Sequence, residues 1–97
     1  NVDLKKIVVP GKVTLVDFYA DWCGPCKKMG PLLEKMVQDD SDLCLRKINI
    51  VGWNSAVAKQ YNIRSIPSVW VFNRKGQLVG QPSHSLSEIQ SLAQQAK

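Results

Sequence analysis

Residues 13–19 form a nearly unbroken run of apolar, β-branched and aromatic side chains, and a pair of cysteines follows this run closely. A run of this composition is typical of a strand that is covered on both faces of a sheet. After the cysteines, apolar residues recur at helical spacing to about residue 39, at Met29, Leu32, Leu33, Met36 and Val37. This periodicity predicts an amphipathic helix that begins at the cysteines, so the pair lies where a buried strand meets a helix N-terminus.

A second buried strand is predicted at residues 43–50. Strand, helix and strand in this order form a right-handed βαβ unit with parallel strands. Three further patterns follow along the chain. They predict a short helix at residues 55–61, a hairpin with strands at residues 68–72 and 77–79, and a terminal amphipathic helix at residues 85–96. The terminal helix begins with the spacing of a capping box, from Ser85 to Glu88. The sheet is therefore expected to have a parallel core and a hairpin at one side.

Length and composition limit the classes of protein to which the chain can belong. The sequence has 97 residues, 44% of them hydrophobic and 22% charged, which predicts a single α/β domain over residues 1–97. Its longest apolar runs are far shorter than the ~20 residues that a membrane-spanning helix needs. The formal charge of +5 is scattered and forms no basic patch interleaved with aromatic residues. We therefore expect no membrane span and no nucleic-acid partner.

Cys23 and Cys26 enclose Gly24 and Pro25 in a C-x-x-C motif. Zinc sites share this spacing, but the position between a buried strand and a helix is that of a redox pair. At the helix N-terminus, unpaired N–H groups and the helix dipole favour a thiolate, so Cys23 is the predicted nucleophile. Cys26, one turn later, is the predicted resolving thiol that attacks the mixed disulfide. Gly24 and Pro25 keep the two sulfurs close without bulk.

Two alternatives for the cysteines remain open at this stage. The pair forms a purely structural disulfide in one of them, although so short a loop would add little stability. In the other, Cys23, Cys26, Cys44 and His84 together form a zinc site. Cys44 lies in the second predicted strand, and we interpret it as an inert core thiol, with a regulatory thiol as the alternative.

Residues 16–27, Val-Asp-Phe-Tyr-Ala-Asp-Trp-Cys-Gly-Pro-Cys-Lys, and residues 63–68, Ile-Arg-Ser-Ile-Pro-Ser, resemble the thioredoxin family. The resemblance extends from about Gly11 to the C-terminus. It implies the thioredoxin fold, a central mixed β-sheet flanked by helices. Only about a dozen residues precede Val13, so the first strand and the long first helix of the family cannot both fit, and we expect a shortened N-terminal edge.

The resemblance also implies roles for two charged residues. Asp17 matches the family aspartate that lies beneath the cysteines and acts through water as a proton shuttle for the resolving thiol. Desolvation in an apolar strand raises the pKa of a carboxyl group, which suits this role near neutral pH. Lys47 matches the lysine that neighbours and tunes this aspartate. The alternatives are a solvent-facing aspartate and an ordinary solvated lysine.

Pro67 matches the family proline whose peptide bond is cis and which lies opposite the cysteines. Proline is the residue for which the cis form is accessible. Such a loop would let the backbone of Ile66 pair with an extended client segment. The apolar surface beside it would be formed by Trp22, Gly24 and Pro25. The alternative is a trans proline that merely opens a strand.

Two departures from the family pattern lie near the expected site. Trp53 stands in a loop where thioredoxins usually have an acidic residue, and we expect it either to enlarge the partner surface or to pack locally. His84 lies in a region that lacks the usual family glycine. It is expected either to sense pH or contact substrate, or simply to face solvent.

The resemblance implies a protein-disulfide reductase that exchanges the Cys23–Cys26 couple with client proteins. No metal is expected, and no cofactor beyond the redox-active disulfide. A separate thiol-donating reductase would return the electrons, and the chain is expected to be a monomer. The alternatives are a dedicated exported partner with few clients and a redox-inactive or zinc-binding docking domain. The chain begins at Asn1 without a leader, and we expect an exported, periplasmic-type location, with the cytoplasm as the alternative.

Overall fold

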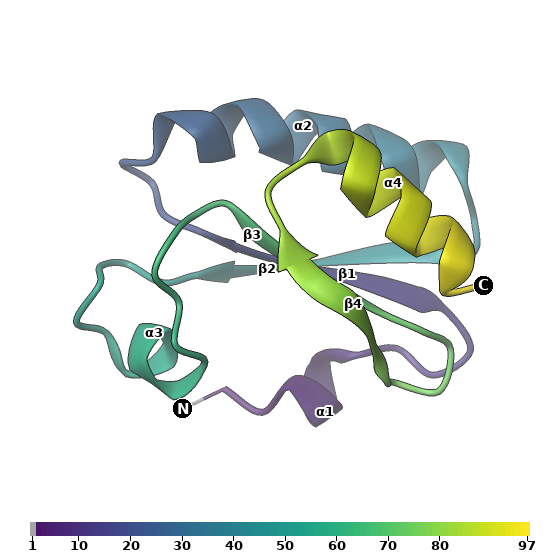
Figure 1. Cartoon of the computed structure of the whole chain (residues 1–97), viewed down its shortest axis with the longest axis horizontal. Helices are drawn as coiled ribbons and strands as arrows, with labels where there is room; N and C mark the ends of the chain where they lie inside the picture. Colours follow the sequence, from purple (N-terminus) through teal and green to yellow (C-terminus); the bar gives the residue numbers. More distant parts are fainter. Residues whose placement is uncertain (1) are drawn as a thin grey trace.

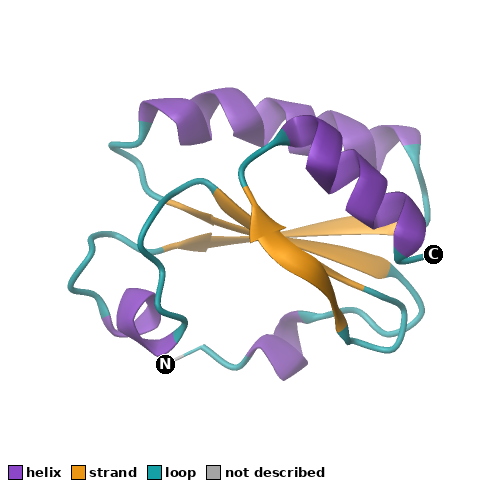
Figure 2. Cartoon of the chain, viewed as in Figure 1, coloured by secondary structure: helices purple, strands orange, loops and turns teal. Residues whose placement is uncertain are grey.

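The computed structural model describes residues 2–97, in which helices and strands alternate much as the sequence predicts (Figures 1 and 2). In chain order the elements are α1 (Leu4–Ile7), β1 (Val13–Tyr19), α2 (Gly24–Asp39), β2 (Leu43–Asn49), α3 (Ala56–Gln60), β3 (Ser68–Phe72), β4 (Leu78–Ser83) and α4 (Leu86–Gln95). The short helix α1 is the element that no sequence pattern predicted. Among the described residues, no helix has the length and apolar character needed to span a membrane.

The four strands form one mixed sheet in the order β2-β1-β3-β4. β1 pairs in parallel with β2 and antiparallel with β3, and β3 pairs antiparallel with β4. β1 is therefore an interior strand, and its residues from Val13 to Phe18 are all buried. The predicted thioredoxin-type mixed sheet is confirmed. No strand of the described chain lies beyond β2, so the N-terminal edge is short, as expected.

The structure corrects the prediction for two strands. β2 is an edge strand and only half-buried, with Arg46 and Lys47 exposed, because it has a neighbour on one side alone. β4 continues to Ser83 instead of ending at residue 79. A register shift between Val69 and Val71 lets the strand bend and continue, and a proline is tolerated in an edge strand.

Helices cover both faces of the sheet, with α2 and α4 on one face and α1 and α3 on the other (Figure 1). Side chains in β1 alternate between these faces. Val13 and Leu15 belong to the core under α2 and α4, whereas Val16 and Phe18 belong to the core on the α1 and α3 face. Asp17 shares the alternation of Val13 and Leu15, so it lies on the α2 side, close to where that helix begins.

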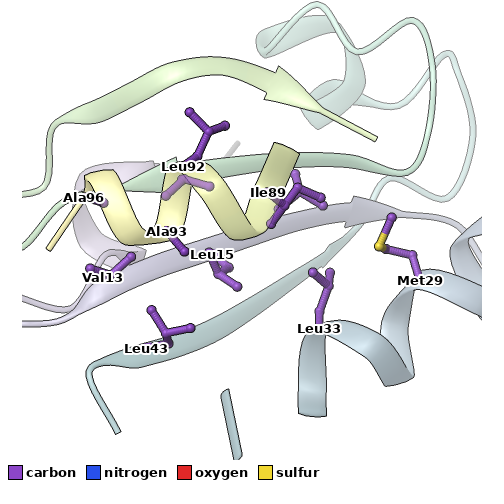
Figure 3. Close-up of a cluster of buried hydrophobic side chains, with 11 residues drawn as sticks. Val13, Leu15, Met29, Leu33, Leu43, Ile89, Leu92, Ala93 and Ala96 are labelled. Carbon is purple, nitrogen blue, oxygen red and sulfur yellow. The ribbon is translucent and has the colours of Figure 1, made fainter. Parts of the chain in front are cut away.

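The core under α2 and α4 consists of buried aliphatic side chains (Figure 3). Its members are Val13, Leu15, Met29, Leu33, Leu43, Val69, Val71, Ile89, Leu92, Ala93 and Ala96. Leu33 is fully buried, but the adjacent Leu32 is 44% exposed. The predicted apolar stripe of this helix is therefore too wide, because neighbouring helical residues point about 100° apart and only one of the two leucines can face the sheet.

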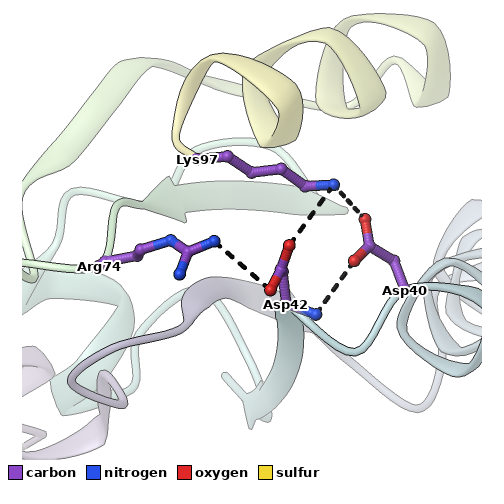
Figure 4. Close-up of polar contacts among 4 residues, drawn as sticks. All are labelled: Asp40, Asp42, Arg74 and Lys97. Carbon is purple, nitrogen blue, oxygen red and sulfur yellow. Dashed lines mark hydrogen bonds and ion pairs between the residues drawn. The ribbon is translucent and has the colours of Figure 1, made fainter.

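Four charged residues connect three segments near the C-terminus (Figure 4), at the end of the molecule away from the start of α2 (Figure 1). The Lys97 ammonium contacts the carboxylates of Asp40 and Asp42, and Arg74 lies 3.4 Å from Asp42. These contacts join the end of α4, the α2–β2 loop and the β3–β4 turn. All four side chains are partly exposed, so their contribution to stability is small beside that of the apolar core.

The two adjacent leucines of α2 provide a test of this packing. Leu33→Ala removes a fully buried side chain and is expected to lower the free energy of unfolding by about 3 kcal/mol. Leu32→Ala removes an exposed side chain from the same helix and is expected to cost less than about 1 kcal/mol. Urea unfolding of the oxidised protein measures both, and equal losses for the two variants would contradict the packing described here.

Candidate functional site

The two cysteines lie at the start of α2 and form a disulfide. Cys23 is the N-cap residue of this helix and Cys26 lies in its first turn, with their Cα atoms 5.3 Å apart. The backbone N–H of Cys26 donates to Cys23 Sγ at 3.2 Å. This N–H is one of the groups that the helix leaves unpaired, and it would stabilise negative charge on Cys23 Sγ in the reduced form. The geometry therefore favours Cys23 as the thiolate of the pair.

The loop before β3 lies against this disulfide. The peptide bond between Ile66 and Pro67 is cis, as the resemblance implied. The carbonyl oxygen of Ile66 lies 3.8 Å from Cys23 Sγ. Two segments more than 40 residues apart in the chain thus meet at one sulfur atom, which places backbone polar groups beside the reacting centre.

A shallow apolar groove of about 410 Å³ begins at these two segments. Its lining comes from the start of α2, the loop before β3 and the residue after β4: Pro25, Lys28, Met29, Leu32, Ser65, Ile66, Pro67 and His84. Pro25, Ile66 and Pro67 were expected at a client surface, and the structure brings them together. His84 is exposed but lines the same groove. Leu32, which sequence periodicity assigned to the core, also lines it.

Trp22 contacts the loop that follows β2. Its indole N–H donates to the carbonyl oxygen of Val51 at 2.7 Å. The ring of Trp53 meets the ring of Trp22 edge-on, with 5.7 Å between centroids. The structure thus places Trp53 beside the disulfide segment. Val51 is the residue that sequence reasoning missed, because a main-chain acceptor 29 positions away leaves no mark in the sequence.

Asp17 is buried in β1 on the α2 side of the sheet, with 1% of its surface exposed. Neither carboxylate oxygen has a hydrogen-bond partner among the described protein atoms. Desolvation raises the pKa of this carboxyl group from 3.8 to about 6, and the positive charge of Lys47 opposes the rise without cancelling it. The solvent-facing alternative for Asp17 is therefore wrong.

Lys47 lies directly opposite Asp17 in the register of β1 and β2. Its ammonium is 3.8 Å from a carboxylate oxygen of Glu34 and 4.9 Å from the centroid of the Tyr19 ring. The side chain is 41% exposed, so Lys47 is both a neighbour of the aspartate and partly solvated. A cavity of about 460 Å³ lined by Cys26 and Lys47, among others, has room for water beside the resolving sulfur.

Cys44 lies apart from the reactive pair. It is the second residue of β2 and pairs with Thr14, near the beginning of β1, whereas Cys23 follows the end of that strand. Its thiol donates to Thr14 Oγ1 at 3.4 Å and is only half-buried, which corrects the expectation of a core thiol. Because the length of β1 separates Cys44 from Cys23, the four residues of the zinc alternative do not meet. Within residues 2–97, no group of three or more His, Cys, Asp or Glu side chains could hold a metal ion.

The raised pKa of Asp17 predicts a specific dependence of stability on pH. Between about pH 4 and pH 6 the folded protein binds a proton at Asp17 that the unfolded chain has lost, so this residue makes the protein less stable as pH rises. Above about pH 6 the burial of the charged carboxylate costs up to about 3 kcal/mol. Asp17→Asn removes this term. The stability of the variant relative to wild type should therefore increase from pH 4 to pH 7 in urea unfolding of the oxidised proteins.

Asp21→Asn is the matched control for this experiment, because Asp21 is exposed in the loop after β1. Its stability relative to wild type should change little over the same range. A difference between Asp17→Asn and wild type that is constant with pH would show that the buried carboxyl does not titrate in this interval.

Comparisons with known proteins agree with the fold and the disulfide geometry. The model of the thioredoxin family matches residues 3–96. A thioredoxin of Mycoplasmoides gallisepticum is 36% identical over 94 residues, which cover 92% of each chain. Thioredoxin 2 of Chlorobaculum tepidum is 42% identical over 77 residues, which cover 78% of this chain and 69% of the relative.

Solved structures show the same arrangement of helices and strands. Thioredoxin of Fasciola hepatica superposes with a TM-score of 0.77 over 97% of this chain and 91% of its own, at 22% identity, which supports the fold alone. Spinach chloroplast thioredoxin f in its long form gives a TM-score of 0.75 over 90% of this chain and 72% of its own, at 27% identity. With its family model, its relatives and a disulfide at the N-terminus of α2, the chain belongs to the thioredoxin family of thiol–disulfide oxidoreductases.

Proposed function

We propose that this chain reduces disulfides of client proteins, with Cys23 as nucleophile and Cys26 as resolving thiol. Members of the thioredoxin family are disulfide reductases that act by thiol–disulfide exchange on client proteins. The observation that carries the assignment of roles is the N–H of Cys26 directed at Cys23 Sγ at the helix N-terminus. It favours the thiolate at one position of the pair, and the thiolate is the form that attacks.

The reaction proceeds in two exchanges. The thiolate of Cys23 attacks one sulfur of the client disulfide, forms a bond to it and releases the other client sulfur as a thiolate. Cys26 then loses its proton and attacks Cys23 Sγ, which releases the second client thiolate and leaves the Cys23–Cys26 disulfide. The client gains two electrons and the dithiol loses two. A dithiol donor of a separate reductase must therefore return two electrons before the next cycle.

Asp17 accepts the proton of Cys26 in this proposal, and the positive charge of Lys47 limits how far burial raises the pKa of Asp17. A carboxyl group whose pKa is about 6 is mostly ionised at neutral pH and still basic enough to take a proton through water. The pocket lined by Cys26 and Lys47 has room for water at the sulfur end of this path, whereas Asp17 is buried in β1 and does not line the pocket. No cofactor beyond the disulfide is needed, because the electrons move with the sulfur bonds.

The client segment lies across the disulfide in an extended form. The backbone of Ile66 pairs with it, and this pairing is supported by the 3.8 Å approach of the Ile66 carbonyl to Cys23 Sγ. Gly24 adds no side chain at the contact and Pro25 lines the groove. Lys28 gives the groove a positive charge, and both Lys28 and His84 line it where the client binds.

The reduction potential of the Cys23–Cys26 couple tests the direction of electron flow. Equilibration with glutathione redox buffers, read by the fluorescence of Trp22, is expected to give a potential near or below about −250 mV, from which electrons run to most labile disulfides. A potential above roughly −180 mV would make the protein an oxidant or isomerase instead.

Single-turnover exchange with a protein disulfide tests the roles of the three residues. Cys26→Ser is expected to stop at the mixed disulfide, whereas Cys23→Ser forms none. Asp17→Asn should form the mixed disulfide at the normal rate and resolve it about 100-fold more slowly at pH 7. Acid quenching and mass measurement follow the adduct. Exchange by Cys23→Ser at the wild-type rate would refute the assignment of the nucleophile.

A further inference from the structure

Three large apolar side chains lie exposed next to the reacting disulfide, and we name Trp22, Val51 and Trp53 the tryptophan patch. Their exposed fractions are 55%, 70% and 46%. Trp22 links the other two, because its indole N–H donates to the main-chain carbonyl of Val51 and its ring meets the ring of Trp53 edge-on. Exposed apolar side chains are common singly, but a contiguous group that includes two tryptophans marks an interaction surface.

The backbone at Val51 is unfavourable for the residue that it carries. Val51 has a φ of +66°, and the N–H of Gly52 donates across it to the carbonyl of Ile50 at 2.7 Å. This is the γ-turn of positive φ, which is rare and strained, and a β-branched side chain makes it worse. Because the Val51 side chain is mostly exposed, its burial within the chain does not compensate for the strain. Glycine would suit this backbone better, so the valine side chain requires another explanation.

Disulfide exchange brings the client protein next to the tryptophan patch. In the mixed disulfide, the client sulfur is bonded to Cys23, the residue that follows Trp22. An extended segment advances about 3.3 Å per residue, so client residues one to three positions from the reacting cysteine reach the patch. The patch is therefore continuous with the client contact that disulfide exchange requires, and its occupant is a part of the client.

We infer that the tryptophan patch binds a large apolar side chain of the client, located one to three residues from the client cysteine that reacts with Cys23. This inference rests on the proposed reductase function and adds a selectivity to it. The patch carries no charged side chain, whereas the groove includes Lys28. An aromatic or leucine-sized anchor would bury apolar surface against both indole rings, which a polar residue would not do.

Two synthetic disulfide-linked peptides test the inference. They are identical except that the residues two before and two after the cysteine are Phe in one and Ser in the other. The reduced wild-type protein is expected to react about tenfold faster with the Phe peptide, measured as the second-order rate constant. Trp53→Ala should bring this ratio to within about twofold of one.

Val51→Gly separates binding from folding. Glycine accepts the positive φ at this position, so the variant should melt at or above the wild-type temperature. The ratio of its rate constants for the Phe and Ser peptides should nevertheless fall, because the apolar side chain of Val51 is lost. Leu78→Ala is the matched control, since Leu78 is also exposed but pairs with Phe72, at the other end of the sheet. This variant should keep the wild-type ratio.

The outcomes distinguish the inference from the function on which it rests. A small aromatic disulfide such as dithiobis(nitrobenzoic acid) reports exchange without a peptide segment. The inference is wrong if wild type reduces this small disulfide but reacts with the two peptides at equal rates. It is also wrong if Val51→Gly and Trp53→Ala keep the wild-type ratio of the two peptide rates, because the patch then does not select clients. If wild type reduces none of the three, the proposed reductase function fails, and the inference fails with it.

Discussion

The burial of β1 between two layers of helices is the constraint on which the other features depend. Its residues from Val13 to Phe18 are inaccessible to solvent, so the strand cannot shift in register without exposing apolar surface. The turn after this strand therefore delivers Cys23 to one place, the N-cap of α2. The same alternation that buries Val13 and Leu15 places Asp17 under that helix start. Nucleophile and buried acid are thus positioned by one strand.

The site carries two features that oppose stability. Asp17 is a carboxyl without a hydrogen-bond partner among the described residues, and Val51 adopts a backbone conformation that suits glycine. Each is held in place by the structure around it. Asp17 lies in the interior strand β1, and the backbone of Val51 is fixed by hydrogen bonds from Trp22 and to Asn49. Such features persist where the chemistry or the binding at the site benefits from them.

The surface around the disulfide is not uniform. The apolar groove with Lys28 and His84 extends from Pro25 and the cis-proline loop, whereas the tryptophan patch extends from Trp22. Both surfaces are built from loops and helix ends, which can change without disturbing the core. The reactive sulfur of Cys23 therefore lies between two surfaces, the groove and the tryptophan patch. In our proposal, the contacts of these surfaces decide which client the protein reduces.

Local patterns in the sequence determined β1, α2, the mixed character of the sheet and the position of the cysteine pair, because strand and helix periodicities and capping act over a few residues. They also marked Asp17 as an acid in an apolar strand. Tertiary structure alone decided that Leu32 faces the groove instead of the core, that β2 is a half-buried edge and that β4 extends to Ser83. It also decided that Trp53 meets Trp22 and that His84 joins Pro67. These contacts join segments that are distant in the chain. They depend on the order of the strands and on how the helices pack on the sheet, and local sequence patterns carry no information on either.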